Sequence, residues 1–224
     1  MKSILFFNYK GGVGKTSLAT AYALTFNKTL ITNDTTFNPE KLGFTKYVKL
    51  DESKKTISAH LLDDSCVFDM GAMSGSMDFK TLAAIKNSEA IIIPTLIDVN
   101  SINLTIKTIK EAQEYIDKRN IFVIFNKIVT SKSKIAYHDA YGKIAEYLEE
   151  SNIFMMKETT LYTRLVNGGA DLLQFVFNDK GVAQLKHTIE YQKNLFDNIN
   201  TLIKNNSKVI WYDWFSKNGT PIRW

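Results

Sequence analysis

A glycine-rich run between an apolar segment and a helical one constrains this chain more than any other feature. Residues 10–17 read Lys-Gly-Gly-Val-Gly-Lys-Thr-Ser and follow shortly after the apolar run Ser3–Phe7. Glycines let backbone N–H groups curl around an anion, and a helix that begins at Lys15 adds its positively polarised N-terminus. Tyr9 stands where the pattern G-x-x-x-x-G-K-[ST] has its first glycine. The run therefore predicts a phosphate-binding turn between a buried strand and a helix.

Short apolar runs alternate with helical stretches along the rest of the chain. The apolar runs are continuous, as in parallel strands that are covered on both faces. The expected strands are Ser3–Phe7, Thr29–Thr32, Cys66–Phe68, Ala90–Pro94, Ile121–Phe125 and Ile153–Met156, with an additional candidate at Lys46–Leu50. The expected helices are Lys15–Phe26, Asp78–Lys86, Ser101–Lys118, Lys134–Glu149 and Gln184–Lys204. Asn100 or Ser101 is the expected cap of the third helix. This alternation predicts an α/β fold in which helices cover both faces of a mostly parallel, twisted sheet.

Length and composition bound the remaining possibilities. The 224 residues predict a single domain, residues 1–204, followed by a distinct aromatic tail, residues 205–224. The single cysteine, Cys66, excludes an intrachain disulfide and a cysteine-built zinc or iron–sulfur site. The apolar stretches are too short to span a bilayer, so we expect a cytoplasmic protein. A net charge of +5 favours an anionic partner such as nucleotide, nucleic acid or a membrane surface.

The chemistry of each side chain suggests how the turn would hold a nucleotide. Lys15 would place its ammonium on the β- and γ-phosphates, Thr16 would offer its hydroxyl to Mg²⁺, and Ser17 would reach the α-phosphate. The residues expected to bind the nucleotide are Lys10, Gly11, Gly12, Val13, Gly14, Lys15, Thr16 and Ser17.

At these residues the sequence resembles the ParA/MinD family of ATPases, whose deviant Walker A signature reads Lys-Gly-Gly-Val-Gly-Lys-Thr. The resemblance covers roughly residues 1–175 and is nearest to short ParA-type partition ATPases. It implies a P-loop NTPase fold, ATP and Mg²⁺ as ligands, and slow, partner-stimulated hydrolysis of ATP to ADP and phosphate. It also implies a homodimer when ATP is bound, in which Lys10 reaches the phosphates held by the partner subunit. A cation that arrives only on dimerisation would neutralise charge on the transferred phosphoryl group.

Two aspartates are candidates for the reacting end of the nucleotide. Asp69 follows the apolar residues of Cys66–Phe68, as in a Walker B strand, and would hold Mg²⁺ together with Thr16. The family carries Asp-x-Asp-Pro after its second strand, and the later aspartate positions the attacking water. A gapless register puts Asn33 and Thr35 at the two aspartate positions here, and a slip of one residue gives the role to Asp34. We select Asp34 as the third catalytic residue beside Lys10 and Lys15, because threonine is a poor base.

Asn126 is the candidate for contact with the base. It ends the strand at Ile121–Phe125, where the family places an asparagine at the adenine edge. In GTPases, Asn-Lys is followed two residues later by an aspartate that reads guanine. Val129 occupies that position, which does not support guanine selectivity.

The resemblance leaves three hypotheses for the cellular function of ATP binding and hydrolysis by this chain. A ParA-type ATPase would bind DNA nonspecifically, associate with the nucleoid, partition plasmid or chromosomal DNA, and respond to a ParB-like or other stimulating partner. A MinD-like switch would need an amphipathic C-terminal helix, which the break at Asn218–Pro221 disfavours. A weakly hydrolysing regulatory relative is the third. The first is preferred, and its candidate DNA contacts are Lys132, Lys134, Arg164, Lys186, Lys193, Lys204 and Lys208.

Overall fold

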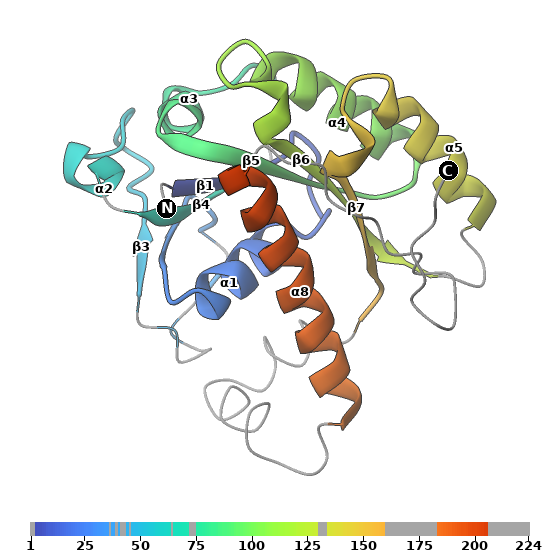
Figure 1. Cartoon of the computed structure of the whole chain (residues 1–224). Coiled ribbons are helices and arrows are strands. Elements are labelled where there is room, and N and C mark those ends of the chain that lie inside the picture. The colour runs from blue at the N-terminus through green and yellow to red at the C-terminus, as the bar shows by residue number, and fades with distance from the viewer. Residues whose placement is uncertain are drawn as a thin grey trace.

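A parallel sheet of seven strands forms the centre of the molecule (Figure 1). The computed structural model describes residues 3–35, 37–38, 40, 44, 46–63, 65–71, 75–129, 134–159 and 183–205. The strands are β1 (Ser3–Phe7), β2 (Thr29–Thr32), β3 (Tyr47–Lys49), β4 (Cys66–Met70), β5 (Ser88–Thr95), β6 (Ile121–Ile128) and β7 (Ile153–Lys157). Their order across the sheet is β3-β2-β4-β1-β5-β6-β7, and neighbouring strands pair in parallel. All six expected strands and the additional candidate are confirmed, as is the α/β fold class.

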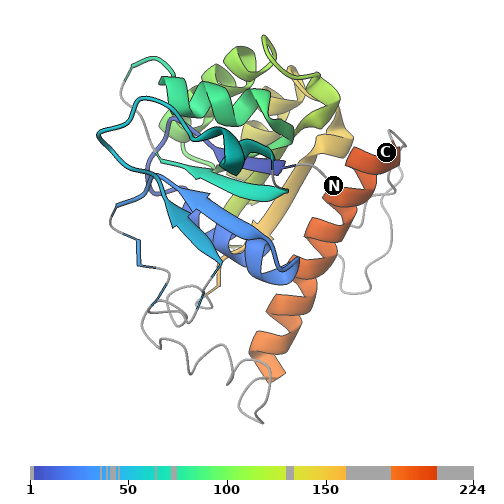
Figure 2. The same ribbon diagram turned by 90° about the vertical axis from the view of Figure 1, so that its left-hand side faces the viewer.

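Helices cover both faces of the sheet, as Figures 1 and 2 show from two directions. One face packs against α1 (Lys15–Thr25) and α8 (Ala183–Asn205). The other packs against α3 (Phe79–Lys86), α4 (Val99–Ala112) and α5 (Lys134–Ala145). Shorter elements are α2 (Ala59–Asp63), which the sequence did not predict, and the 3₁₀ turns η2 (Lys118–Asn120) and η3 (Glu150–Asn152). The tail beyond Asn205 lies outside the described residues.

The start and end of α4 differ from the prediction. Asp98 caps the helix, rather than Asn100 or Ser101, because its carboxylate accepts a hydrogen bond from the Ser101 backbone N–H at 3.0 Å. The helix ends at Ala112 instead of Lys118. From there the chain tightens into turns, and the Asp117 carboxylate caps η2 ahead of β6. The prediction followed apolar spacing, which continues past the last helical turn.

Two hydrophobic cores form because neighbouring strand residues point to opposite faces of the sheet. In β1, Ile4 and Phe6 pack toward α1 and α8, whereas Leu5 and Phe7 pack toward α3, α4 and α5. The strands are parallel, so all their carboxyl ends lie at one edge of the sheet. The loops after β1, β2, β4, β5 and β6 leave from that edge, where ligands bind in open α/β sheets.

Candidate nucleotide-binding site

The glycine-rich turn lies between β1 and α1, as the sequence predicts. Gly14 is the N-cap of α1 with a φ of 94°, and Gly12 has a φ of 75°. Both angles fall in the left-handed region, which glycine adopts without steric cost. A Cβ at Gly14 would lie 2.3 Å from Nδ2 of Asn126, so glycine is required there by space as well as by conformation. Val13 is buried, whereas Gly11 and Gly12 are exposed, so the outer part of the turn is open to a ligand.

Lys15 is a buried cation at the start of α1. Its side chain is 6 % exposed, and Nζ donates a hydrogen bond to the carbonyl oxygen of Lys10 at 2.8 Å. Burial lowers the pKa of Lys15 to about 8 from its ordinary value of 10.5, while the nearby carboxylates of Asp69 and Asp34 oppose that lowering. Burial has removed water from around this ammonium. The negative oxygens of a bound polyphosphate would stabilise its charged form in place of that water, so Lys15 suits an anion-binding site.

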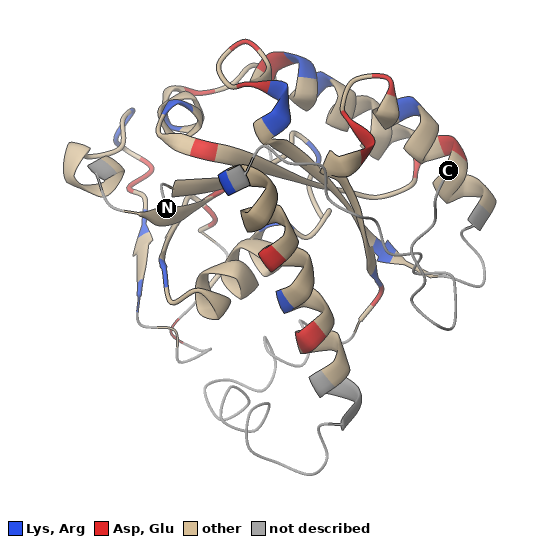
Figure 3. Cartoon of the chain, viewed as in Figure 1, with Lys and Arg blue, Asp and Glu red and all other residues tan. Residues whose placement is uncertain are grey.

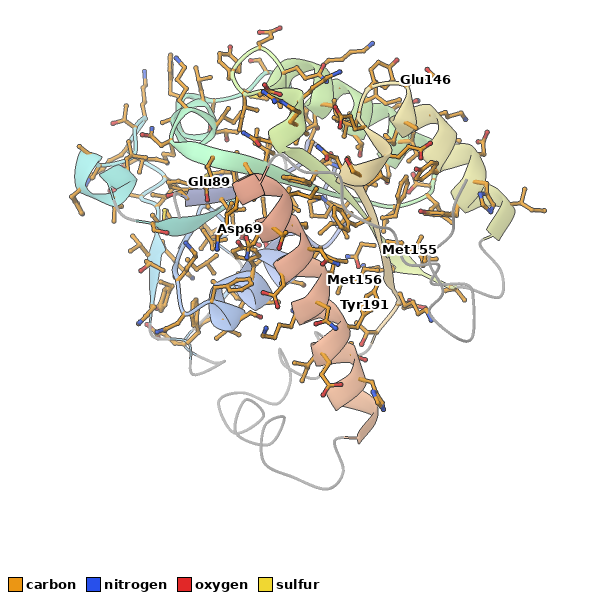
Figure 4. All side chains as sticks on the ribbon, in the orientation of Figure 1. Asp69, Glu89, Glu146, Met155, Met156 and Tyr191 are labelled. Carbon is orange, nitrogen blue, oxygen red and sulfur yellow. The ribbon has the colours of Figure 1, made fainter. Side chains whose placement is uncertain are left out.

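Asp69 is a fully buried carboxylate at the end of β4, labelled in Figure 4. Its Oδ2 accepts a hydrogen bond from the Thr32 hydroxyl at 2.8 Å, and its Oδ1 has no hydrogen-bond partner. Burial raises the pKa of Asp69 to about 6, although the hydrogen bond from Thr32 opposes the rise. A buried carboxylate oxygen without a donor is costly unless a cation satisfies it.

The donor set around Asp69 fits Mg²⁺. Asp34 and Thr16 supply further oxygen atoms, and the Thr16 hydroxyl donates to Oδ2 of Asp34 at 3.1 Å. Within the described part of the chain, no cluster of three or more His, Cys, Asp or Glu side chains could hold a metal unaided. Mg²⁺ is commonly held by one or two carboxylates together with substrate phosphates and water. The residues therefore suit an ion that arrives with a nucleotide.

The loop after β2 brings Asp34 to the phosphate-binding turn. Its Oδ2 meets Thr16, and its Oδ1 accepts from the Phe37 backbone N–H at 3.3 Å. Asn33 points elsewhere, because its Oδ1 accepts from the Gly71 backbone N–H at 2.5 Å, and Thr35 is exposed. Of the three residues considered from the register, Asp34 is thus the one whose side chain contacts the turn. Its role with water stays a prediction.

Asn126 lies against the phosphate-binding turn. Its Nδ2 donates to the carbonyl oxygen of Val13 at 2.9 Å, and its Oδ1 accepts from the Lys127 backbone N–H at 2.9 Å. One amide hydrogen and one lone pair of Oδ1 are used in these two contacts, so the other hydrogen and the second lone pair are the groups left for the predicted base contact. The observed contacts show that Asn126 holds the turn in place.

A buried polar network fixes the residues that precede the turn. Asn8 is fully buried, and its Nδ2 donates to the Pro94 carbonyl at 2.8 Å and to the Thr105 hydroxyl at 2.9 Å. Its Oδ1 accepts from the Lys10 backbone N–H at 2.9 Å and from the Thr108 hydroxyl at 3.4 Å. The network ties Lys10 to β5 and to the inner face of α4.

Comparison with solved structures finds proteins of the ParA, MinD and McdA kinds among those similar to this chain. No family model matches the sequence, and no curated protein matches it. The chain is similar to the ParA family ATPase from Chlorobium tepidum, with a TM-score of 0.57 and 15 % identity over 86 % of this chain and 99 % of the other. It is similar to MinD from Pyrococcus horikoshii, solved with Mg-ADP, with a TM-score of 0.57 and 13 % identity over 91 % and 99 %. A Cyanothece McdA variant, solved with ATP, gives a TM-score of 0.55 and 16 % identity over 88 % and 96 %.

The chain has the ParA/MinD fold. The predicted P-loop NTPase architecture is thereby confirmed by the similar structures as well as by the order of the strands. At these levels of identity the similarity establishes the fold, and the roles of individual residues rest on the geometry of this chain.

Sequence reasoning missed three residues that shape the site in this ParA/MinD fold. Asn8, Thr32 and Lys127 contact the turn or its carboxylate through side chains that are distant in sequence or lie at a strand end. A single asparagine or threonine beside an apolar strand gives no signal of its own, because turns and strand ends commonly use these residues. Only the packing of α4 against Asn8, of β2 against β4, and of the end of β6 against the turn reveals them.

Charges of both signs are interspersed over the α3, α4 and α5 side of the ParA/MinD fold (Figure 3). Among the candidate DNA contacts, Lys193 lies on α8 and pairs with Asp197 at 2.7 Å, and Lys204 lies near the end of the same helix. Lys134 and Lys186 lie within α5 and α8, and Lys132, Arg164 and Lys208 lie outside the described residues. None of the described helices is long and apolar enough to cross a membrane.

Proposed function

We propose that this chain is a ParA-type switch ATPase that binds Mg·ATP at the turn after β1, dimerises, and slowly hydrolyses the nucleotide. The observation that carries the proposal is the convergence of a buried lysine, a buried carboxylate with one unpaired oxygen and two left-handed glycines at the carboxyl edge of the sheet. Cation, metal ligand and backbone N–H groups are the parts that phosphoryl transfer requires. McdA and MinD structures of the same fold, which contain ATP and Mg-ADP, support the ligand assignment.

Each side chain would have a distinct task in hydrolysis. Lys15 leaves the Lys10 carbonyl to neutralise the β- and γ-phosphates. Thr16 and Asp69 hold Mg²⁺, which offsets charge on the phosphate oxygens. Asp34, already hydrogen-bonded to Thr16, orients the attacking water and accepts its proton. Thr35 has no carboxylate that could help Asp34 to orient the water or accept its proton. We therefore expect slow turnover that a partner protein stimulates.

Dimerisation would join two copies through the carboxyl edge of the sheet. Phe79, Val99 and Ile135 are 70 %, 69 % and 88 % exposed, and each lies at the start of a helix that follows β4, β5 or β6. Large apolar side chains that gather at one edge mark a surface for another protein. Lys10 lies at the same edge, and its backbone N–H is held by Asn8. Hydrogen bonds from Ser101 lower the pKa of Asp98, and the positive charge of Lys10 lowers it further. The Lys10 ammonium is therefore near the start of α4. A second copy docked here would meet that ammonium.

The dimer is tested by light scattering after gel filtration with ATP, with ADP and without nucleotide. We expect an ATP-specific dimer in the wild type and a monomer in Lys10→Ala, with ATP binding to the Lys10→Ala monomer retained because Lys15 is intact. Lys15→Ala should lose nucleotide binding altogether. A Lys10→Ala variant that dimerises like the wild type would reject the role of Lys10 across the interface.

Nonspecific DNA is the partner we propose for the ATP-bound dimer. The support is the net charge of +5 and the ParA family ATPase among the similar structures. We expect ATP-dependent retention on DNA of arbitrary sequence, and weaker binding with rising salt because counterions are released on binding. Retention on anionic liposomes in place of DNA would instead favour a MinD-like switch.

A further inference from the structure

Tyr9 stands where the standard phosphate-binding pattern has a glycine, and its side chain has a defined set of partners. It is 3 % exposed, and its ring packs edge-on against Phe7 with the centroids 5.3 Å apart. Its hydroxyl donates a hydrogen bond to Oε2 of Glu111 on α4. Nζ of Lys107, on the same helix, lies over the ring at 4.1 Å from its centre, where the negative face of the ring attracts a cation. A glycine at residue 9 could make none of these contacts.

Lys107 also holds the segment that leads from β4 to α3. Its Nζ donates a hydrogen bond to the carbonyl oxygen of Gly75 at 2.7 Å and lies 3.7 Å from Oε1 of Glu111. Lysine and glutamate four positions apart share one face of a helix, so both can meet a side chain that lies against that face. The ammonium of Lys107 therefore joins the ring of Tyr9 to the chain ahead of α3.

Met77 is a second point at which this segment meets Tyr9. Its side chain packs against the hydrophobic core that includes Tyr9. Burial and the Glu111 carboxylate raise the pKa of the Tyr9 hydroxyl, and a hydrogen bond from the Met77 backbone opposes that rise. Tyr9, Lys107 and Glu111 together form a clamp, the Tyr9 clamp, which holds the chain at Gly75 and at Met77.

The Tyr9 clamp lies between the proposed nucleotide site and the exposed apolar edge. Lys10 follows Tyr9 directly and begins the phosphate-binding turn. On the other side, Met77 is followed by Asp78, whose carboxylate caps α3. Phe79 is the first residue of that helix and is 70 % exposed. The clamp therefore connects the turn to the apolar side chain with which α3 begins.

We propose that Tyr9 and Lys107 are positioning residues, which fix the start of α3 relative to the phosphate-binding turn and so present Phe79 to the second copy in the ATP-bound dimer. This inference rests on the proposed function and adds to it the residues that connect the two sites. A contact residue that is held in place before association loses less conformational freedom on binding, so the same apolar contact gives more affinity. Without the clamp, dimerisation would have to order the chain ahead of α3.

The test compares dimerisation with nucleotide binding in Tyr9→Phe, which loses the hydroxyl but keeps the ring. We expect sedimentation equilibrium to show an ATP-dependent dimer about tenfold weaker than that of the wild type. Calorimetry with Mg·ADP, which reports on the turn without dimerisation, should give an affinity within about twofold of the wild type. Hydrogen exchange at the backbone amides of residues 75–79 should become faster in the nucleotide-free chain. The lost hydrogen bond should also lower the melting temperature by about 2–4 °C.

Tyr22→Phe is the matched control for stability, because Tyr22 is fully buried and its hydroxyl donates to Asn200 on the opposite face of the sheet. It should lower the melting temperature by a similar amount and leave the dimer unchanged. Lys107→Met keeps the stem and loses the ammonium, so its dimer should weaken at least about threefold. Lys110→Met is its control on the same helix, because Nζ of Lys110 lies over a different ring, that of Tyr147. The Lys110→Met variant should dimerise as the wild type does.

A dimer of wild-type strength in Tyr9→Phe or in Lys107→Met would overturn the inference. An equal loss of the dimer in Tyr22→Phe would assign the effect to lowered stability and would also overturn it. A loss of Mg·ADP affinity in Tyr9→Phe as large as the loss of dimerisation would show that Tyr9 acts on the turn itself, which rejects the link to Phe79. If the wild type forms no ATP-specific dimer, the proposed function itself fails, and this inference fails with it.

Discussion

Two glycines of the phosphate-binding turn, Gly12 and Gly14, share a positive φ but differ in their surroundings. Nothing lies within 4 Å of a Cβ built at Gly12, whereas a Cβ at Gly14 would collide with the Asn126 amide at 2.3 Å. The first glycine is needed for backbone conformation, and the second is needed also for close approach of β6. The sequence pattern asks for glycine at both positions, but a side chain would cost backbone strain at Gly12 and both strain and a steric clash at Gly14.

Replacing Gly14 by alanine should therefore destabilise the fold more than replacing Gly12. We expect Gly12→Ala to lower the free energy of unfolding by about 1–2 kcal/mol, from the left-handed conformation alone. Gly14→Ala adds a steric clash and should cost at least about 3 kcal/mol. Urea denaturation measures both. Gly142→Ala is the control, since Gly142 lies in α5 with open space around it and should gain up to about 1 kcal/mol.

Lys15 should make nucleotide affinity depend on pH above neutrality. Burial lowers its pKa to about 8, so the free protein loses the ammonium proton as the pH rises through that value. A bound triphosphate favours the charged form, so binding takes up a proton and affinity falls by up to about tenfold between about pH 8 and about pH 9.

Calorimetry in buffers with different ionisation enthalpies measures the proton uptake at Lys15. Lys15→Arg keeps its charge throughout, so whatever affinity it retains should be independent of pH over this range. Flat wild-type affinity from about pH 7 to about pH 9 would show that Lys15 does not titrate there.

At the scale of elements, α4 is an internal support for the turn. Its inner face carries the buried hydroxyls of Thr105 and Thr108, which meet Asn8 rather than apolar side chains. An apolar helix face would pack equally well against the sheet, but it would leave the Asn8 amide and the Lys10 backbone without this network. The polar stripe on α4 thus connects packing of the helix to the position of Lys10.

Asn8→Ala should lower the free energy of unfolding by about 2–4 kcal/mol, because it leaves buried partners such as the Pro94 carbonyl without a hydrogen bond. Chemical denaturation measures the loss. Asn87→Ala serves as the comparison, since Asn87 is exposed and its Nδ2 donates only to the Ala83 carbonyl in the same turn. That change should cost less than about 1 kcal/mol. An equal loss of unfolding free energy in the two variants would show that the buried network around Asn8 does not stabilise the fold.

At the scale of the whole molecule, the exposed large apolar side chains of the described residues are distributed unevenly. Phe79, Val99 and Ile135 lie at the carboxyl edge with the phosphate-binding turn, whereas Tyr115 lies between α4 and β6 at the opposite edge. Parallel topology causes this arrangement, because every strand points the same way and every following helix begins at the same edge. The edge of the proposed nucleotide site is therefore also the edge that can bury apolar surface against a second copy.

Ile135→Asp should weaken the ATP-dependent dimer at least about tenfold without unfolding the monomer. Ile135 is 88 % exposed, and an aspartate in the first turn of α5 is favourable to the helix dipole. We expect stability to change by less than about 0.5 kcal/mol. Sedimentation equilibrium measures the dimer. Tyr115→Ser should dimerise as the wild type does, and a dimer that tolerates the aspartate would place the interface elsewhere.

The fold could be predicted from sequence because its signals are local. Continuous apolar runs marked six of the strands within a few residues, since burial on both faces leaves a pattern that needs no knowledge of neighbours. The seventh strand, β3, is partly exposed, and the sequence offered it only as an additional candidate. The predicted end of α4 was wrong, because apolar spacing continues into the turns after Ala112. The short α2 lies in a polar stretch that carries no periodic signal.

The sequence by itself determined the phosphate-binding turn, since the glycines, Lys15 and Thr16 act through their own backbone and immediate neighbours. Tertiary structure alone decided which residues converge on that turn. Asn8 needs α4, Asp34 rather than Thr35 meets Thr16, and Lys127 reaches Gly12 through a bulge in β6. These contacts join residues far apart in the chain, and a contact between distant residues depends on how the elements pack, which no local pattern encodes.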